Sequence, residues 1–538
     1  MSREQKKIVV SSAFNLLSTY SIYFLGLLST FFIARLITPE EWGILLFSLT
    51  FVGVGAYFCY FFPPGAGTTL QYYISRLKNG DKSKINEMRN FIFHVYKIRL
   101  VFTISIFIIY LLVIQLFSFN EKIIQTLLIT SPLIIIIVFQ NLNNSILLGF
   151  QKFRRVFYVH IVNMIIYTSG TMLVYLLKLK YPLFLIALLY VAGGLISLIT
   201  SIIFTFIIIP SKNIITTGKN ISEKKNYVEI HKKYGLYLVL SGIIAQINGF
   251  IIYYLFISFG VIAFITYFVI CSNIVSFIQN MSGSSRSSYL SIFSEINSNE
   301  KKNEFTTLFY QTNKYLLLFL GIIVGSMFFL IEFYIILIYS ETYLLIVLAV
   351  QILLFSSFAS VITRNLIIIT QSTNRTKINL KIQIFQSGLF LISTLIALVF
   401  FDFYILIIFY LISRFLTAIY LVYIINKKSD FNLKQIPIFK PFFLFSISFF
   451  LALPITFFIN FQIFSEFLML NFLLNSLLRV LVFFVFYYLI IFFSKYITKE
   501  EFKMLIEIFP IVNSQNKLIQ KIVYYAEKFF QSEKIKNQ

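Results

Sequence analysis

The sequence has few charged residues, and the acidic ones are the scarcest. Only 12% of its 538 residues are charged while 59% are hydrophobic, and 21 Asp and Glu residues stand against 45 Lys and Arg residues. Because a soluble domain carries roughly a quarter charged residues, the composition excludes an ordinary soluble protein. The two cysteines, Cys59 and Cys271, lie in apolar stretches, which argues against a disulfide framework or a metal site. The sequence has no Gly-rich nucleotide-binding motif, and no cofactor is predicted.

Long apolar stretches follow one another along almost the whole chain. Each is about 20 residues or more, the length that crosses a bilayer as a helix. They predict an all-α polytopic membrane protein with about fourteen transmembrane helices, at 9–34, 43–75, 97–119, 123–149, 155–178, 181–209, 235–257, 261–285, 315–339, 343–369, 378–400, 403–425, 439–461 and 467–493. The second stretch is too long for one straight crossing, and the prolines and glycines of "FFPPGAGTT" (61–69) are expected to bend or break its helix.

The basic residues are distributed unequally between the two sides of these spans. With the N-terminus inside, most Lys and Arg residues outside the spans lie on the inner side, and the outer side holds Arg35, Lys122, Lys178 and Lys180. The positive-inside rule therefore places both termini and the segment 211–233 in the cytoplasm, and the chain in the cytoplasmic membrane. Anionic lipid headgroups account for the net charge of +24, so membrane lipids are expected partners and nucleic acid is not.

A short turn interrupts the apolar sequence between the first two spans. Thr38 suits an N-cap, Pro39 the first helical position, and Glu40 and Glu41 the first turn of a helix. Trp42, the only tryptophan, suits the aromatic belt at a membrane–water interface. The turn is therefore predicted to begin the second helix on the outer side.

The chain also repeats itself weakly. "LLGFQKFRR" (147–155) is similar to "IITQSTNRT" (368–376), and Thr370 lies 221 positions after Gly149. Hydropathy follows the same offset, which predicts two parallel six-helix lobes, at 1–210 and 234–430, joined by the basic linker 211–233. Two additional helices (431–494) and a cytosolic amphipathic tail (495–538) follow. Repeats of this kind are typical of transporters that bind their substrate between the two halves.

Three segments resemble the polysaccharide-repeat flippases (O-antigen, exopolysaccharide and teichuronic types). They are "FIARLITPEEWGILLFSLTFVG" (32–53), "LLGFQKFRR", and 240–275, although Ala263, Phe264 and Tyr267 stand in the turn where the family usually has glycine and tyrosine. The likeness covers most of residues 1–430. It implies membership of the multidrug, oligosaccharidyl-lipid and polysaccharide exporter superfamily, with two six-helix lobes around a central cavity and alternating access.

Polar residues within the spans are the candidates for a substrate site. Arg414 and Arg479 lie near the middle of their spans, where arginine is costly and usually faces a cavity or a partner, whereas Arg364 is close enough to a span's end to reach the headgroups. The full set of candidate substrate-binding residues is Arg286, Gln279, Ser276, Ser272, Arg414, Arg479, Asn15, Asn141 and Asn144, of which the first four share one face of the predicted helix 261–285. The alternative for the hydroxyl and amide residues is helix packing.

The scarcity of acids separates the classes of transporter. Only Glu332 lies well within a predicted span, whereas an exporter of organic cations needs buried carboxylates. Buried arginines pair naturally with phosphate. The sequence therefore predicts a flippase, not an enzyme, for a lipid-linked glycan that carries phosphate or pyrophosphate, with glycan-assembly enzymes as candidate partners. There are three alternatives. The first is a lipid II-type flippase, whose family has arginines in its first helix, and the second is a multidrug exporter. The weakest is a membrane glycosyltransferase or polymerase, which would need a larger outer loop.

Overall fold

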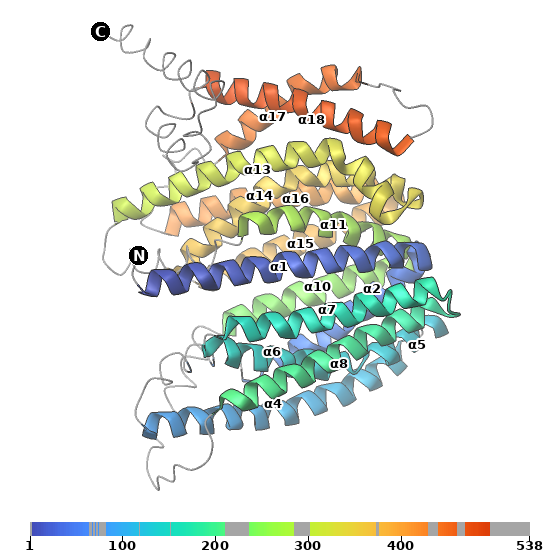
Figure 1. Cartoon of the computed structure of the whole chain (residues 1–538), viewed down its shortest axis with the longest axis vertical. Helices are drawn as coiled ribbons and strands as arrows, with labels where there is room; N and C mark the ends of the chain where they lie inside the picture. Colours follow the sequence, from blue (N-terminus) through green and yellow to red (C-terminus); the bar gives the residue numbers. More distant parts are fainter. Residues whose placement is uncertain are drawn as a thin grey trace. The chain divides into compact units, whose positions relative to one another are not determined.

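The computed structural model describes residues 3–63, 67, 70, 74, 82–117, 119–150, 152–209, 236–283, 302–372, 376–428, 439–459, 468–494 and 496. These residues form helices joined by short turns, with no strand among them (Figure 1). The first helices are α1 (Arg3–Leu36), α2 (Pro39–Cys59), α4 (Lys82–Leu116), α5 (Glu121–Thr130), α6 (Leu133–Gly149), α7 (Phe153–Leu176) and α8 (Pro182–Ile208). Next come α10 (Leu236–Ser258), α11 (Ala263–Gly283), α13 (Lys302–Tyr339), the 3₁₀ turn η2 (Glu341–Ile346), α14 (Val347–Ser372), α15 (Thr376–Phe400), α16 (Phe403–Lys428), α17 (Lys440–Phe457) and α18 (Leu468–Phe493).

The helices confirm an all-α polytopic membrane protein. Thirteen described segments are long and apolar enough to cross a membrane, α5 and α6 forming one of them, and α1 adds the shorter apolar stretch Tyr20–Leu36. Most predicted spans agree with the helices to within a few residues. The exceptions are α2, which ends at Cys59 whereas the predicted span continues to 75, and α4 and α13. The last two begin at Lys82 and Lys302, well before the predicted starts at 97 and 315, because each has a polar first part ahead of its apolar one.

The start of α2 follows the local sequence. The Thr38 hydroxyl accepts a hydrogen bond from the Glu41 backbone N–H, and the Glu41 carboxylate accepts one from the Thr38 N–H, at 3.3 Å each. This reciprocal capping box satisfies two donors that a helix start leaves open. Pro39 occupies the first helical turn, as predicted.

The end of α2 depends on a residue far along the chain. The helix ends at Cys59, just before the segment of prolines and glycines that was expected to break it. Arg99, 2% exposed in the middle of α4, donates hydrogen bonds to the Cys59 carbonyl and, at 3.3 Å, to the Pro63 carbonyl. A carbonyl freed by a broken helix needs a donor where water is scarce. The sequence prediction included Arg99 in the span 97–119 without giving it a role, and placed it near the start of that span; the early start of α4 puts it in the middle of the helix instead.

The structure comprises two compact units. Unit 1 contains residues 1–320 and 331–438, and unit 2 contains 321–330 and 439–538. Within unit 1 the repeat of 221 residues is visible in the helices: the offset carries α4 onto 303–337, against Lys302–Tyr339 for α13, and carries α8 onto 403–429, against Phe403–Lys428 for α16. Helix pairs repeat as well, because α1 packs on α7 as α10 packs on α15, and α6 on α8 as α14 on α16. We call the helices α1–α8 the N-half and the helices α10–α16 the C-half.

The two halves meet along a seam built mainly on α2, which packs against both α10 and α11. Midway along α2, the rings of Phe51 and Phe250 stack with centroids 4.7 Å apart. We call the side of unit 1 that holds the α1–α2 turn the turn side, and the opposite side, from which α1 starts, the N-terminal side. The predicted linker 211–233 and nearly all of the predicted tail 495–538 lie outside the described residues.

Unit 2 consists of α17, α18 and a short stretch of α13. Gly321 and Gly325 are four residues apart on that stretch, and a Cβ on either would collide with the side chain of Tyr487 or Phe483 of α18. Small residues at this spacing let two membrane helices approach closely. Helix α18 thus packs closely against this stretch of α13 because Gly321 and Gly325 have no side chain there.

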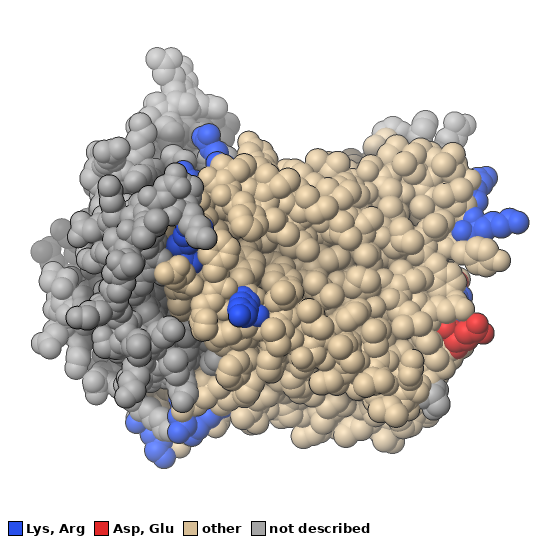
Figure 2. All heavy atoms as spheres, turned by 90° about the horizontal axis from the view of Figure 1, so that it is seen from below, with Lys and Arg blue, Asp and Glu red and all other residues tan. Residues whose placement is uncertain are grey.

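Figure 2 shows where the charged side chains lie on one face. Blue Lys and Arg atoms lie toward both ends of the tan surface, red Asp and Glu atoms lie at its right end, and the broad part between shows almost no charged atoms. A bilayer requires such a band, because charge is costly in the hydrocarbon core.

Candidate functional site

The polar face of α11 is partly engaged by an arginine. Gln279 is 6% exposed, and its side-chain oxygen accepts a hydrogen bond from Arg364 of α14 at 3.0 Å. Arg364 donates a second bond, also 3.0 Å, to the Asn280 side-chain oxygen. The expectation that Arg364 extends to the headgroups is therefore wrong, because the neighbouring α11 offers its guanidinium two amide acceptors.

This polar group continues across the seam. The Asn280 amide donates to the hydroxyl of Tyr23 on α1, which belongs to the other half of unit 1. The same tyrosine packs edge-on against Phe277, with ring centroids 5.3 Å apart. The α11 face thus lies at the boundary between the halves. Ser272 and Ser276 are half-buried on this helix, and the Ser272 hydroxyl is buried without a hydrogen-bond partner among the described residues.

Arg414 has a different environment. It lies near the middle of α16 and donates a hydrogen bond to the hydroxyl of Tyr410, one turn earlier on the same helix. Its guanidinium also lies over the Tyr410 ring, 4.7 Å from the centroid. Tyr410 in turn packs against Phe268 of α11 and Phe390 of α15, at 5.2 and 4.7 Å between ring centroids. No acidic residue in the described part of the chain forms an ion pair with Arg414.

Four other arginines bind backbone carbonyls at the ends of helices. Arg35 donates to the Leu337 and Ile338 carbonyls at the end of α13, and Arg155 to Phe204 near the end of α8 at 3.1 Å. Arg479 donates to the Ile459 carbonyl just after α17, at 2.9 Å, and Arg99 caps α2 as described above. A positive charge at a helix C-terminus satisfies open carbonyls and complements the helix dipole. These contacts give all four arginines a structural role.

Two of these arginines, Arg479 and Arg99, have roles that the sequence analysis did not assign to them. Arg479 was expected to face a cavity or a partner and was a candidate for binding substrate; the structure gives it a partner within the protein, the carbonyl just after α17, and its Nε atom is buried without a partner among the described residues. Arg99 was missed as a buried residue. Its signal lay in the helix break at 61–69, because a broken helix needs a donor for its open carbonyls.

The amides of the N-half form a network among its own helices. Asn141 donates to the Tyr60 hydroxyl, and the Asn144 amide lies 3.4 Å from His160 Nε2. Gln140 donates to Ser197 at 2.5 Å and Asn143 to Ser201 at 3.0 Å, both on α8. These bonds join α6 to α7, to α8 and to the residue after α2, and agree with the packing alternative, although the Asn144 oxygen is buried without a partner among the described residues.

Two of the predicted site residues cannot be placed. Arg286 lies outside the described residues, and of Asn15 the structure describes the helical backbone alone. Of the predicted set, the C-half therefore contains Ser272, Ser276, Gln279 and Arg414, and Arg364 joins it at the seam.

The interior has basic and amide groups but few acids. Among the residues whose burial the structure describes, Glu332 of α13 is the one acidic side chain that lies well inside an apolar segment, and it is half-buried. Within that part of the chain, no three His, Cys, Asp or Glu side chains come together as metal ligands would. Guanidinium groups suit phosphate oxygens, and amides and hydroxyls suit sugar hydroxyls.

Comparison with known proteins yields similar structures only. No protein-family model and no curated protein matches the chain. Among solved structures, the lipid II flippase MurJ in an inward closed conformation superposes with a TM-score of 0.64 and 19% identity, over 88% of this chain and 98% of that one. An inward-facing multidrug resistance MATE family transporter of the MOP superfamily gives 0.61 and 17%, over 76% and 96%. A MOP superfamily transporter from Pyrococcus furiosus gives 0.57 and 17%, over 79% and 97%.

These similarities define the class of fold. The chain is a multi-pass membrane protein with the fold of these transporters. Identities below one fifth show the fold alone, and each of these structures belongs to a transporter, not an enzyme.

Proposed function

We propose that this chain is a flippase that moves a lipid-linked oligosaccharide or polysaccharide repeat unit across the cytoplasmic membrane by alternating access. It would belong to the polysaccharide-repeat flippases of the MOP superfamily. The observation that carries the proposal is the position of Arg414 in the middle of a membrane helix, where its guanidinium binds a tyrosine of its own helix and no helix end.

A guanidinium in this position can bind a phosphate. It presents N–H groups in a planar fork that matches two phosphate oxygens, and Tyr410 uses one of them. Arg35, Arg99, Arg155 and Arg479 are bound to backbone carbonyls, and Arg364 is bound to amides. We therefore assign Arg414 to the phosphate or pyrophosphate of the substrate, and Gln279, Ser272 and Ser276 to its sugars.

The polarity of the interior argues against an organic cation as substrate. A cation requires a buried carboxylate, and Glu332 is the sole candidate in the described spans. We accordingly regard a multidrug exporter as a weaker candidate function than either flippase.

A lipid II-type peptidoglycan precursor is the second candidate substrate. The structure of the lipid II flippase MurJ is matched over 98% of its length and 88% of this chain, which supports this candidate. The two candidates share a lipid-linked phosphate and differ in their sugars.

The orientation also belongs to the proposal. The excess of Lys and Arg on one side places both termini in the cytoplasm and the turn side outside. The two halves would be the lobes 1–210 and 234–430, the helices of 431–494 would be an addition to them, and glycan-assembly enzymes would deliver the substrate at the inner face.

The test is transport by purified protein in vesicles. Three substrates are offered separately: a polyprenyl-diphosphate oligosaccharide, lipid II and a lipophilic organic cation. We expect the diphosphate oligosaccharide to be moved faster than in protein-free vesicles, and the cation not to be. Faster transport of lipid II would establish the second candidate, and transport of the cation alone would overturn both.

A further inference from the structure

The turn between α1 and α2 joins the two halves of unit 1 on the turn side. The Thr266 hydroxyl of α11 donates to the Pro39 carbonyl at 2.6 Å. Gly43 lies against the residue before α11, so that a Cβ on it would come within 2.6 Å of the Ile262 carbonyl oxygen. Glycine is therefore required for the halves to approach this closely.

Arg35 forms a second polar contact of this junction. Its Nη1 donates to the Ile338 carbonyl at 2.9 Å and its Nη2 to the Leu337 carbonyl at 3.2 Å, both in the last turn of α13. Nη1 also donates to the Phe31 carbonyl of its own helix, and the guanidinium lies 3.8 Å from the centroid of the Phe31 ring. One arginine thus binds α1 and the end of a C-half helix together.

Trp42 adds an aromatic contact beside Arg35. It is 7% exposed, and its ring stacks on Tyr339 at 6.2 Å and meets Tyr343 edge-on at 6.1 Å. The expectation that Trp42 lies in the lipid interface is therefore incomplete, because the residue is buried and two of the rings against it belong to the other half.

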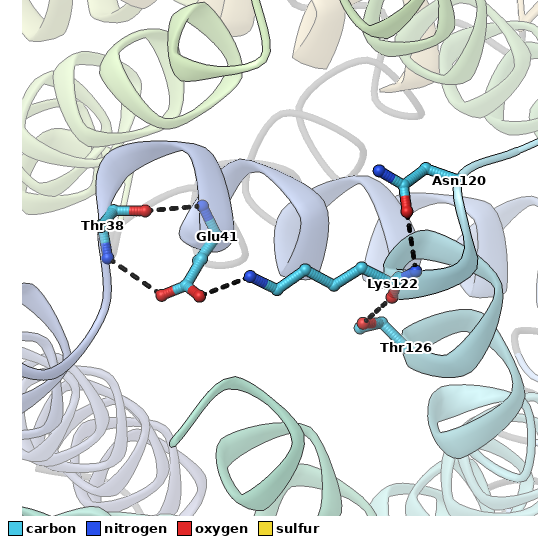
Figure 3. Close-up of polar contacts among 5 residues, drawn as sticks. All are labelled: Thr38, Glu41, Asn120, Lys122 and Thr126. Carbon is cyan, nitrogen blue, oxygen red and sulfur yellow. Dashed lines mark hydrogen bonds and ion pairs between the residues drawn. The ribbon is translucent and has the colours of Figure 1, made fainter. Parts of the chain in front are cut away.

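The turn itself is fixed to the N-half. Figure 3 shows the Glu41 carboxylate between the Thr38 backbone N–H and the Lys122 ammonium group of α5, the latter at 2.6 Å. Lys122 is held in turn through its backbone, which accepts from Thr126 and donates to Asn120. The turn is thus fastened to its own half by a capping box and an ion pair.

The bonds across the junction are suited to separation. They link side chains to backbone carbonyls at helix ends on the turn side, where water can replace each lost partner when the halves part. Exchange of a protein hydrogen bond for one to water costs little net free energy. Midway along α2, by contrast, the seam contains the stacked rings of Phe51 and Phe250, which gain nothing from water.

We propose that Arg35, Trp42 and Gly43 form a latch that closes the transporter on its turn side, with Arg35 holding the end of α13. This inference rests on the proposed alternating access. The latch would have to open each time the substrate leaves on that side, and the equilibrium between closed and open forms depends on its bonds.

The test measures accessibility in purified protein and needs no substrate. Thr266, fully buried beside the turn, is replaced by cysteine in a chain that lacks the two native cysteines, and a water-soluble maleimide is added. We expect Arg35→Ala to speed labelling roughly tenfold, the effect of losing about one net hydrogen bond to a charged group, and Arg35→Lys to speed it less.

The control is Arg155→Ala, which removes the same kind of arginine–carbonyl bond inside the N-half. It should leave labelling at 266 unchanged. Labelling is compared per folded molecule after size-exclusion chromatography, so loss of yield does not affect the result. Equal rates for the Arg35→Lys variant, the Arg35→Ala variant and the parent would overturn the latch, whereas failure of the vesicle assay would overturn the proposed substrate instead.

Discussion

Replacement of Arg414 should weaken substrate binding far more than it weakens the fold. The structure limits what the residue adds to stability: one hydrogen bond to a hydroxyl and one cation–π contact at 4.7 Å, both to Tyr410. These are worth about 1.5–3 kcal/mol and about 0.5–2 kcal/mol. Because both lie within one helix, Arg414→Gln should leave the tertiary contacts of α16 intact.

The loss to a phosphate-bearing substrate would be larger. A guanidinium that binds two phosphate oxygens makes two charge-assisted bonds of about 1.5–3 kcal/mol each. Arg414→Gln should therefore reduce affinity for the lipid-linked glycan by about 100-fold or more, since 1.4 kcal/mol corresponds to a factor of ten. Arg414→Glu should be worse, because like charges repel strongly where the dielectric is low.

The assay is transport per folded molecule in vesicles, for both variants beside the parent. Arg155→Gln is the matched control, since that arginine binds a backbone carbonyl and a phenylalanine ring. It should lower the yield of folded protein and leave transport per molecule unchanged. If both Arg414 variants transport at the rate of the parent, Arg414 has no part in the site and the argument for a phosphate-bearing substrate fails.

Three further variants or pairs test other parts of the reasoning. Arg99→Leu should cost about 2–5 kcal/mol, because two buried carbonyls lose their donor; an unchanged thermal unfolding midpoint in detergent would contradict this. Gly43→Ala should destabilise the protein by about 1–3 kcal/mol through its clash with the other half, whereas Gly26→Ala, with nothing within 4 Å of its new Cβ, should gain up to about 1 kcal/mol; the two midpoints should move in opposite directions. In whole cells, a membrane-impermeant maleimide should label Glu341→Cys and spare Lys219→Cys, and the reverse would invert the predicted orientation.

The sequence alone determined the positions of most helices, because a helix that crosses a membrane needs about 20 consecutive apolar residues and its ends need local signals. The Thr38–Glu41 capping box is such a signal, confined to four residues. The offset of 221 also survives in the structure, since it depends on hydropathy and helix length, which persist when residue identities diverge.

The tertiary structure decided what each buried arginine does. In sequence, Arg414 and Arg479 look alike, each about ten residues inside an apolar span. The end of α17 places a free carbonyl within reach of Arg479, and no helix end does so for Arg414. Likewise, the sequence around Trp42 suits a lipid interface, but in the structure the rings of Tyr339 and Tyr343 pack against it. A buried arginine binds whichever acceptor lies within its reach, and helices distant in the chain supply that acceptor. The role of such an arginine therefore could not be predicted from the residues next to it in the sequence.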